Sequence, residues 1–374
     1  MTALDRRPML EFATDDAALA ALGPEWDELL IDADGASIFL THAWMSAWRN
    51  TVGADEQLLI GVAREPASGQ VVGIAPFAVA THRLGPFNVQ ALRMAGSGLA
   101  ASDHLDMIIR HGHPHAAAEL WKAAGLRRTW DLLDLDGLRP GSHLVRVLLR
   151  RKEDRDAFVT TNTCPVLELP ETWKEYEATL GRNLRQNLGR YARKLDREAS
   201  GPVVERMVVG EQDVSDTVEE LARLHQEIRT ARGDRGSFAD RRMIDFHKAA
   251  ALRFLEAGRL RLHRLDVDGK MAAAISCFRY DDTISFYTTG YDPAYSEYGP
   301  GRRIMAVAIR SAIEEGASRF DFLRGDEAYK QAWGTIYAFD DRIRLPVGPK
   351  GTLLMYAARA ARGVRGVYRG FRRR

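Results

Sequence analysis

Apolar residues in the second half of the chain recur at every second position in some segments and at helical spacing in others. Residues 260–267, 271–280 and 283–291 are rich in β-branched and aromatic side chains, which favours strands. A tight turn at residues 268–270 predicts that the first two strands form a hairpin. Residues 302–316 have helical spacing and end at a glycine, and residues 319–327 predict a further strand.

The first half of the chain has the same order of elements. Helices at 16–32 and 41–50 precede strands at 57–65 and 71–79, and a helix at 113–125 is followed by a strand at 130–137. We therefore expect an α/β protein, with mixed sheets and flanking helices, built as two copies of one domain. The expected divisions are residues 1–160, residues 161–345 and a tail of residues 346–374. The alternative is that strands and helices alternate in this way by chance.

Composition and charge limit the classes of protein that fit. A chain of 374 residues exceeds the size at which one hydrophobic core usually stops growing, which agrees with two domains. The two cysteines, Cys164 and Cys277, form neither a disulfide framework nor a metal-ligand cluster, and no metal is expected. The first residues lack a secretory signal and no apolar stretch is long enough to span a bilayer, which predicts a cytoplasmic protein. A net charge of +2 gives no reason to expect DNA as a partner.

Residues 295–305, YSEYGPGRRIM, form the sharpest local motif. A strand ends, a Gly-Pro-Gly turn follows, and the next helix begins with Arg302 and Arg303. A helix N-terminus presents unpaired N–H groups and partial positive charge, and Gly299 and Gly301 would let a ligand approach the backbone. The motif therefore predicts a phosphate-binding site. The alternative is an ordinary loop-to-helix connection, since the spacing matches neither a dinucleotide-binding motif nor a P-loop.

Three segments together carry a family resemblance: RNLRQNLGRYARKL at 182–195, CFRYDDTISFYTTGYDPAY at 277–295, and SEYGPGRRIMAVAIRSAIEEGASRFDFLRGDEAYKQAWG at 296–334. In these segments the chain resembles the bacterial GNAT-superfamily acetyltransferases associated with cellulose or exopolysaccharide biosynthesis. Their tandem architecture is similar to that of the Fem-type aminoacyl transferases. The resemblance implies acetyl-CoA or another acyl-CoA as the donor, and a small molecule or glycan precursor with an amine or hydroxyl group as the acceptor. By the same resemblance, the pyrophosphate of the donor would bind at Tyr298, Gly299, Gly301, Arg302 and Arg303.

The resemblance also suggests roles for the charged and aromatic residues at 320–334, FDFLRGDEAYKQAWG. Tyr329 would protonate the departing thiolate, and Asp321 or Asp326 would act as a general base on the acceptor. Lys330 and Arg324 would bind an acidic acceptor or a coenzyme phosphate. The alternative is a structural cluster, in which Asp321 pairs with Arg324 and Asp326 pairs with Lys330.

Further substrate-binding candidates lie outside that cluster. They are charged, imidazole or phenolic residues near the expected site, namely Arg182 and Arg185 at the start of a basic amphipathic helix, His225 on a later helix, and Tyr287 and Asp292 around a strand end.

The tail and the basic helix leave other functions open. From Lys350 to Arg374 there are eight basic residues and no acidic one, and apolar and basic positions fall on opposite sides of a helix. This pattern predicts peripheral contact with the inner face of a membrane, and the alternative is a solvated basic tail. A Fem-like transferase that uses aminoacyl-tRNA would bind RNA at residues 182–194. A catalytically silent accessory module of a membrane synthase is the third alternative.

Overall fold

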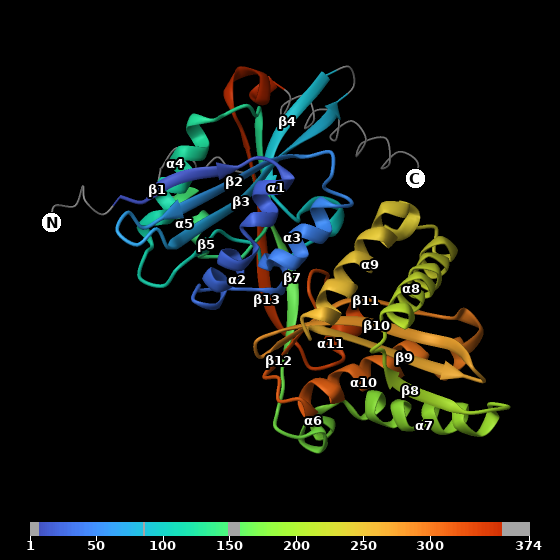
Figure 1. The fold of residues 1–374 in the computed structure, drawn as a ribbon. Helices are drawn as coiled ribbons and strands as arrows, with labels where there is room; N and C mark the ends of the chain where they lie inside the picture. The colour runs from blue at the N-terminus through green and yellow to red at the C-terminus, as the bar shows by residue number, and fades with distance from the viewer. Residues whose placement is uncertain (1–6, 85–86, 149–157, 354–374) are drawn as a thin grey trace.

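The computed structural model describes residues 7–84, 87–148 and 158–353, which form one long mixed sheet with flanking helices (Figure 1). The strands are β1 (Met9–Ala13), β2 (Gln57–Arg64), β3 (Val71–Leu84), β4 (Phe87–Met94), β5 (Ile108–Ile109), β6 (Leu132–Leu138), β7 (Phe158–Glu168), β8 (Val203–Met207), β9 (Leu260–Val267), β10 (Lys270–Tyr280), β11 (Thr283–Tyr291), β12 (Arg319–Asp321) and β13 (Ile336–Pro346). The α-helices are α1 (Asp16–Ala21), α2 (Gly23–Ile31), α3 (His42–Arg49), α4 (His115–Leu126), α5 (His143–Leu148), α6 (Trp173–Thr179), α7 (Arg182–Glu198), α8 (Glu211–Ala231), α9 (Arg241–Glu256), α10 (Pro300–Glu314) and α11 (Ala328–Gln331). Short 3-10 turns are η2 (Ile38–Leu40), η3 (Gly98–Ala100), η5 (Ser237–Ala239) and η6 (Pro293–Tyr298).

The strands follow the order β1-β2-β3-β4-β6-β13-β7-β12-β11-β10-β9-β8, with β5 beside β3. Neighbouring strands are antiparallel except for two pairs, β4 with β6 and β11 with β12. Each half thus contains a hairpin, a helix, and a strand parallel to the second strand of the hairpin. In the first half these are β3–β4, α4 and β6, and in the second half they are β10–β11, α10 and β12. The expected mixed α/β fold is confirmed.

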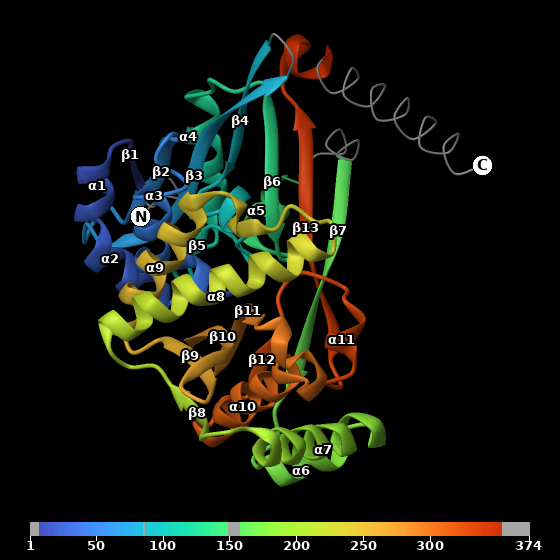
Figure 2. The same cartoon turned by 90° about the vertical axis from the view of Figure 1, so that its right-hand side faces the viewer.

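Strand β13 joins the sheets of the two halves. It lies between β6 and β7, and pairs antiparallel with both. Figure 2 shows β6, β13 and β7 running side by side along the molecule. Residues 336–346, which come late in the chain, therefore sit next to a strand of the first half.

A core of aromatic side chains lies between the halves. Trp44 of α3 is fully buried, and its ring centroid lies 4.8 Å from that of Phe246 and 6.0 Å from that of Phe254, both on α9. The rings of Phe278 on β10 and Tyr287 on β11 lie 5.8 and 5.2 Å away. Buried aromatic pairs contribute both apolar area and favourable ring geometry. This core therefore holds α3 of the first half against α9 and the sheet of the second.

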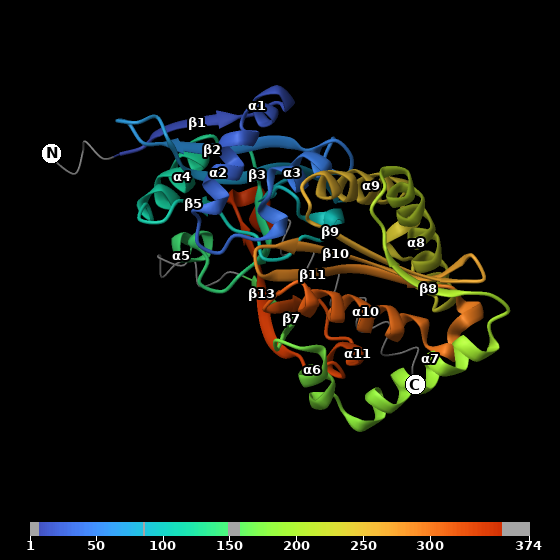
Figure 3. The same ribbon diagram turned by 60° about the horizontal axis from the view of Figure 1, so that its bottom comes forward.

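Helices cover both faces of the second half. Figure 3 shows α8 and α9 on one side of strands β8–β11, with α7 and α10 on the other. Helix α7 confirms the helix expected at residues 182–198, and its Leu184, Leu188 and Leu195 side chains pack toward the core. No helix of the described residues is both long and apolar enough to cross a membrane. The membrane contact expected of the basic tail concerns residues that mostly lie outside the described part of the chain.

Candidate functional site

Strands β11 and β12 pair at only three positions and then separate. Residues 283–285 of β11 lie beside residues 319–321 of β12, in parallel register. Strand β12 ends there, whereas β11 continues to Tyr291. We use the name fork for the diverging segments, residues 286–291 of β11 and residues 322–325 after β12. Ligands of α/β proteins bind beyond the carboxyl ends of parallel strands, and the fork lies at such ends.

Strand β11 also carries a bulge inside the fork. Ser276 of β10 pairs with Thr288, whereas the next residue, Cys277, pairs with Phe286, so Tyr287 is the extra residue. A bulge locally ends the regular pairing and turns side chains and backbone groups into new directions.

Helix α10 begins at the open end of the fork. Gly299 has a φ of 59°, which favours glycine, and Pro300 is the first residue of α10. In the described structure no side chain caps this N-terminus. A Cβ atom on Gly301 would lie 3.2 Å from the Tyr291 ring, and the side chain of Arg302 is exposed. The uncapped helix start, the small residues and Arg302 fit a pyrophosphate group.

Two of the predicted pyrophosphate contacts already bind protein groups. Arg303 donates from Nε to Glu205 Oε1 at 2.5 Å and from Nη1 to Asp196 Oδ1 at 2.9 Å, which ties α10 to β8 and α7. The Tyr298 hydroxyl donates to Glu198 Oε2 at 3.1 Å. Arg302 is thus the arginine best placed for a phosphate.

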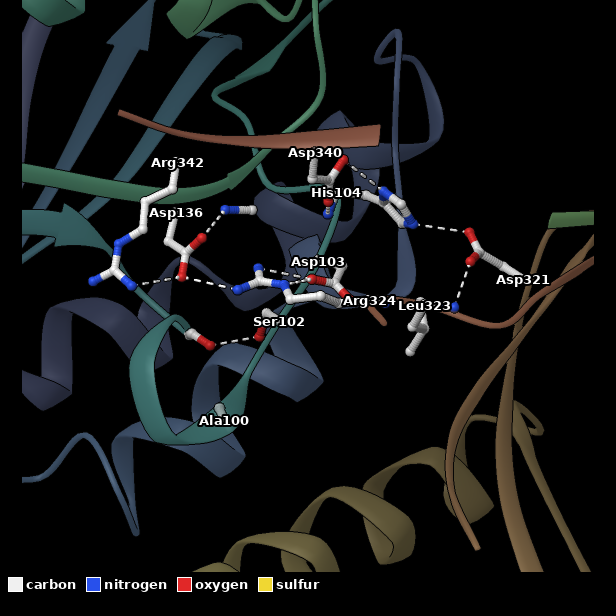
Figure 4. Close-up of polar contacts among 12 residues, drawn as sticks. Ala100, Ser102, Asp103, His104, Asp136, Asp321, Leu323, Arg324, Asp340 and Arg342 are labelled. Carbon is white, nitrogen blue, oxygen red and sulfur yellow. Dashed lines mark hydrogen bonds and ion pairs between the residues drawn. The ribbon is translucent and has the colours of Figure 1, made fainter. Parts of the chain in front are cut away.

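The segment that follows β12 is fixed by contacts from both halves of the chain (Figure 4). Leu323 has a φ of 54°, which is uncommon for a residue with a branched side chain. Its N–H donates to Asp321 Oδ1 at 2.8 Å, and the N–H of Arg324 donates to Asp103 Oδ2 at 2.8 Å. A backbone strained in this way costs about 1–3 kcal/mol and persists where its surroundings hold it, often at functional sites.

A buried histidine of the first half lies between two carboxylates of the second. His104 Nε2 is 2.8 Å from Asp321 Oδ2, and Nδ1 is 3.0 Å from Asp340 Oδ1 (Figure 4). The backbone N–H of His104 also donates to Asp340 Oδ2 at 2.6 Å. Burial alone would lower the pKa of His104, but Asp321 and Asp340 raise it to about 10. The ring is therefore an imidazolium at neutral pH, and it donates to a carboxylate on each side.

Arg324 continues this network toward the surface of the first half. Its Nε donates to Asp103 Oδ1 at 2.9 Å and its Nη1 donates to Asp136 Oδ2 at 3.0 Å. Asp136 also lies 3.6 Å from a guanidinium nitrogen of Arg342. The expected structural pair of Asp321 with Arg324 is wrong, because Asp321 binds His104 and Arg324 binds two carboxylates that come from far along the chain.

Lys330 is buried and holds the segment after β12 from the other side. Its side chain is 4% exposed, and Nζ donates to the carbonyl oxygens of Leu323 at 3.3 Å, Arg324 at 2.9 Å and Gly325 at 3.4 Å. Nζ also lies 3.0 Å from Glu327 Oε2. The expected pair of Lys330 with Asp326 is wrong, since Glu327 is the carboxylate in contact. These contacts give Lys330 a structural role, in place of the expected contact with an acidic acceptor.

Replacing Lys330 by methionine is expected to lower the free energy of unfolding by about 1.5–3 kcal/mol, because buried carbonyl groups lose a charged donor. Urea unfolding followed by circular dichroism measures the change. Lys174→Met, at an exposed position on α6, is the matched control and should unfold like the wild type. An unchanged urea midpoint for Lys330→Met would show that the ammonium group does not hold the segment.

Tyr329 and Asp326 are the two predicted catalytic residues that face solvent. Tyr329 is 44% exposed as a residue, and partial burial together with the Glu327 carboxylate raises the pKa of its hydroxyl above the usual range. The phenol therefore stays protonated and can donate a proton. Asp326 is exposed on the turn between β12 and α11.

The predicted substrate-binding residues do not lie together: some are buried or bind other protein groups, and others are exposed. The Tyr287 hydroxyl donates to the Ala100 carbonyl at 2.7 Å, and its ring belongs to the core between the halves. Asp292 caps η6 by accepting from the N–H of Ala294. Arg182 and Arg185 are exposed at the start of α7, and His225 lies on α8 near the fork.

Three buried residues are close enough together to be tested as a metal site. Ligand atoms of His104, Cys164 and Asp340 lie within 4.8 Å of one another. Both ring nitrogens of His104 already face carboxylates, and burial raises the pKa of the Cys164 thiol. A metal would have to displace these hydrogen bonds and a thiol proton, so the arrangement fits an imidazolium better than a cation site. The same burial makes the thiol a poor nucleophile.

Sequence reasoning did not identify His104 and Asp340 as site residues. The available signal was the polar run Ser102-Asp103-His104 between apolar residues, because buried charged groups need partners. Nothing local identified those partners, since His104 and Asp340 are 236 positions apart.

Comparison with protein-family models finds a match to part of the chain. The family model of the acetyltransferase (GNAT) domain matches residues 182–331, which include the fork and α10. A search of curated protein sequences finds no match.

Several solved structures share the fold over most of the chain. A crystal structure of FemX is 11% identical, with a TM-score of 0.59, and the alignment covers 89% of this chain and 97% of FemX. A protein of unknown function from Bacteroides thetaiotaomicron is 14% identical, with a TM-score of 0.54 and coverage of 91% and 100%. L-PGS from Bacillus licheniformis is 10% identical, with a TM-score of 0.53 and coverage of 90% and 95%.

Proposed function

Starting from the acetyltransferase (GNAT) domain that residues 182–331 carry, we propose that this chain transfers an acyl group from acyl-CoA to an amine or hydroxyl acceptor. The observation that carries the proposal is the fork. Parallel strands separate beside an uncapped helix N-terminus, and an exposed arginine and an exposed tyrosine lie at the two sides. The match to a GNAT domain implies acyl-CoA as the co-substrate.

The chain's own residues have separate tasks in this reaction. The N-terminus of α10 and Arg302 hold the pyrophosphate, where helix N–H groups and a guanidinium meet its charge. Acyl-CoA supplies the activated thioester. Tyr329, which is protonated at neutral pH because its pKa is raised, gives its phenolic proton to the sulfur as the C–S bond breaks. The hydrogen bonds of Asp103, Asp321 and Lys330 keep the segment before Tyr329 in place.

Calorimetric titration with acetyl-CoA tests the donor. We expect binding by the wild type and a loss of about tenfold in affinity for Arg302→Ala, because a charge-assisted contact to phosphate contributes about 1.5 kcal/mol or more. Arg310→Ala is the matched control, as Arg310 is also exposed on α10 but lies farther along the helix. Folded wild-type protein that binds no acetyl-CoA would refute the proposal. Equal losses of acetyl-CoA affinity in the two variants would refute the proposal that the pyrophosphate binds at the N-terminus of α10.

A donor attached to RNA is the second candidate. One observation favours it: the outer face of α7 exposes Arg182, Arg185, Arg190 and Arg193. In this case tRNA would bind the protein and acetyl-CoA would not, and Arg185→Ala with Arg193→Ala would weaken tRNA binding. A role in polysaccharide or cell-envelope biosynthesis stays a prediction of the resemblance.

A further inference from the structure

Helix α8 lies directly on β11 within the fork. A Cβ atom on Gly290 would come within 2.8 Å of the Leu221 carbonyl oxygen and 3.0 Å of the His225 nitrogen of the backbone. Only a residue without a side chain lets the helix approach the strand this closely. His225 is therefore held directly above β11, one of the two strands of the fork.

The His225 ring has a hydrogen-bonding atom that the protein does not use. Nδ1 is buried and has no hydrogen-bond partner among the described residues. The ring packs edge-on against Phe238, with centroids 5.2 Å apart. Burial and the nearby Arg229 lower the pKa of His225 to about 4, so the ring is neutral at pH 7. An unsatisfied buried polar atom costs about 1–3 kcal/mol, which a bound ligand with a suitable group would recover.

Arg229 is a charged residue whose electrostatic field reaches both His225 and Tyr329. Its positive charge acts on both residues, lowering the pKa of His225 and opposing the raised pKa of Tyr329. Figure 2 shows the end of α8 that carries Arg229 directed toward the side of the molecule where α11 lies. Asp234 is a carboxylate of this region, and it already accepts from Arg229 Nη1 at 3.0 Å.

We propose that His225 binds the acceptor nucleophile through Nδ1, and that this nucleophile is a hydroxyl group. The inference rests on the proposed function and specifies its acceptor. A neutral imidazole nitrogen accepts a hydrogen bond from a hydroxyl group. An ammonium group would instead need a carboxylate, and here it would meet the charge of Arg229 while Asp234 is already paired. His247 of α9, 7% exposed and also packed on Phe238, adds a second neutral ring to these surroundings.

The resulting step conserves atoms and charge. The hydroxyl oxygen forms a bond to the acyl carbon, and its proton moves to His225 Nδ1. The C–S bond breaks, and the thiolate takes the proton of the Tyr329 hydroxyl. The imidazolium then returns its proton to the tyrosinate through water, which leaves an ester, the free thiol of CoA and both residues in their starting states.

The test measures thiol release from acetyl-CoA with water alone, with the polyols glycerol and cellobiose, and with the polyamine spermidine. We expect glycerol or cellobiose to raise thiol release above the rate with water alone, and spermidine to leave it unchanged. We also expect alkaline hydroxylamine to cleave the product once residual acetyl-CoA has been removed, because it cleaves oxygen esters and leaves amides intact. His225→Phe should lower the rate about 100-fold, the usual lower size of a general-base contribution, without changing acetyl-CoA affinity. His225→Asn, whose side-chain oxygen can accept a hydrogen bond near the position of Nδ1 but cannot take up a proton, should recover the KM for the acceptor but not the rate.

His263→Phe is the matched control, because His263 is also buried with a pKa lowered to about 4, but lies on β9. Melting temperatures report whether each variant folds. A product stable to hydroxylamine, or a His225→Phe rate equal to that of the control, would overturn the inference. Acetyl-CoA binding without transfer to either polyol would also overturn it. Absence of acetyl-CoA binding would instead refute the proposed function.

Discussion

Replacing Asp340 by alanine is expected to lower the free energy of unfolding by about 3–5 kcal/mol, the usual effect of removing one partner of a buried ion pair. Asp340 is 0% exposed, and it accepts hydrogen bonds from both the backbone N–H and Nδ1 of His104. Without Asp340, a buried imidazolium keeps only Asp321, and a buried backbone N–H loses its acceptor.

Asp341 provides the matched control for Asp340. It is the next residue of β13 but is partly exposed, and its carboxylate accepts from the Thr161 hydroxyl at 2.8 Å. Asp341→Ala should change stability by less than about 1 kcal/mol, as is typical of surface substitutions. Urea unfolding of the three proteins gives the comparison, with equal slopes showing that only stability has changed. Equal midpoints for the two variants would contradict a buried charge pair between the halves.

Stability is expected to fall as the pH rises from about 7 to about 10. His104 has a pKa of about 10 in the folded protein, whereas an unfolded histidine has a pKa of about 6.5. A group whose pKa is raised by folding contributes fully below the unfolded pKa, and its contribution is lost as the pH approaches the folded pKa. Between the two values the folded protein holds one more proton, so the free energy of unfolding decreases by about 1.4 kcal/mol per pH unit.

His104→Gln isolates this effect from other groups that titrate in alkali. Burial also raises the pKa of Cys164, so the wild type alone does not identify the histidine. The variant should be less stable at pH 7 and should have a flatter pH dependence from pH 7 to pH 9, measured by urea unfolding at fixed ionic strength. Parallel pH curves for the two proteins would show that the histidine is not protonated in the folded state.

Local patterns predicted the elements of the fold well, because they depend on neighbouring residues. Alternating apolar side chains located β9, β10 and β11, and the glycine at residue 316 follows the end of α10. The motif at 295–305 likewise located a strand, a turn and a helix start, since all its parts are contiguous.

The charged network could not be predicted in the same way. Arg324 and Asp103 are 221 positions apart, and His104 and Asp321 are 217 apart. A sequence shows that buried charges need partners, but it does not show which residues those partners are. The sequence therefore favoured pairs between neighbouring residues, Asp321 with Arg324 at i,i+3 and Asp326 with Lys330 at i,i+4. In the structure, His104 and Arg324 pair with carboxylates that are distant in the sequence. They do so because the order of strands brings β12 and β13 next to residues 103 and 104 of the first half.

The position of β13 also determines when the sheet of the first half can be completed during synthesis of the chain. Strands β1 to β6 leave the ribosome first, but the partner on the edge of β6 consists of residues 341–346 of β13. Until those residues emerge, the edge of β6 has unpaired backbone groups, which are open to pairing with other chains. His104 and Asp103 likewise lack their partners Asp321 and Arg324, respectively, until those residues have been translated. The edge of β6 is therefore covered only after β13 has been translated, so the sheet of the first half depends on residues that follow the sheet of the second half in the chain.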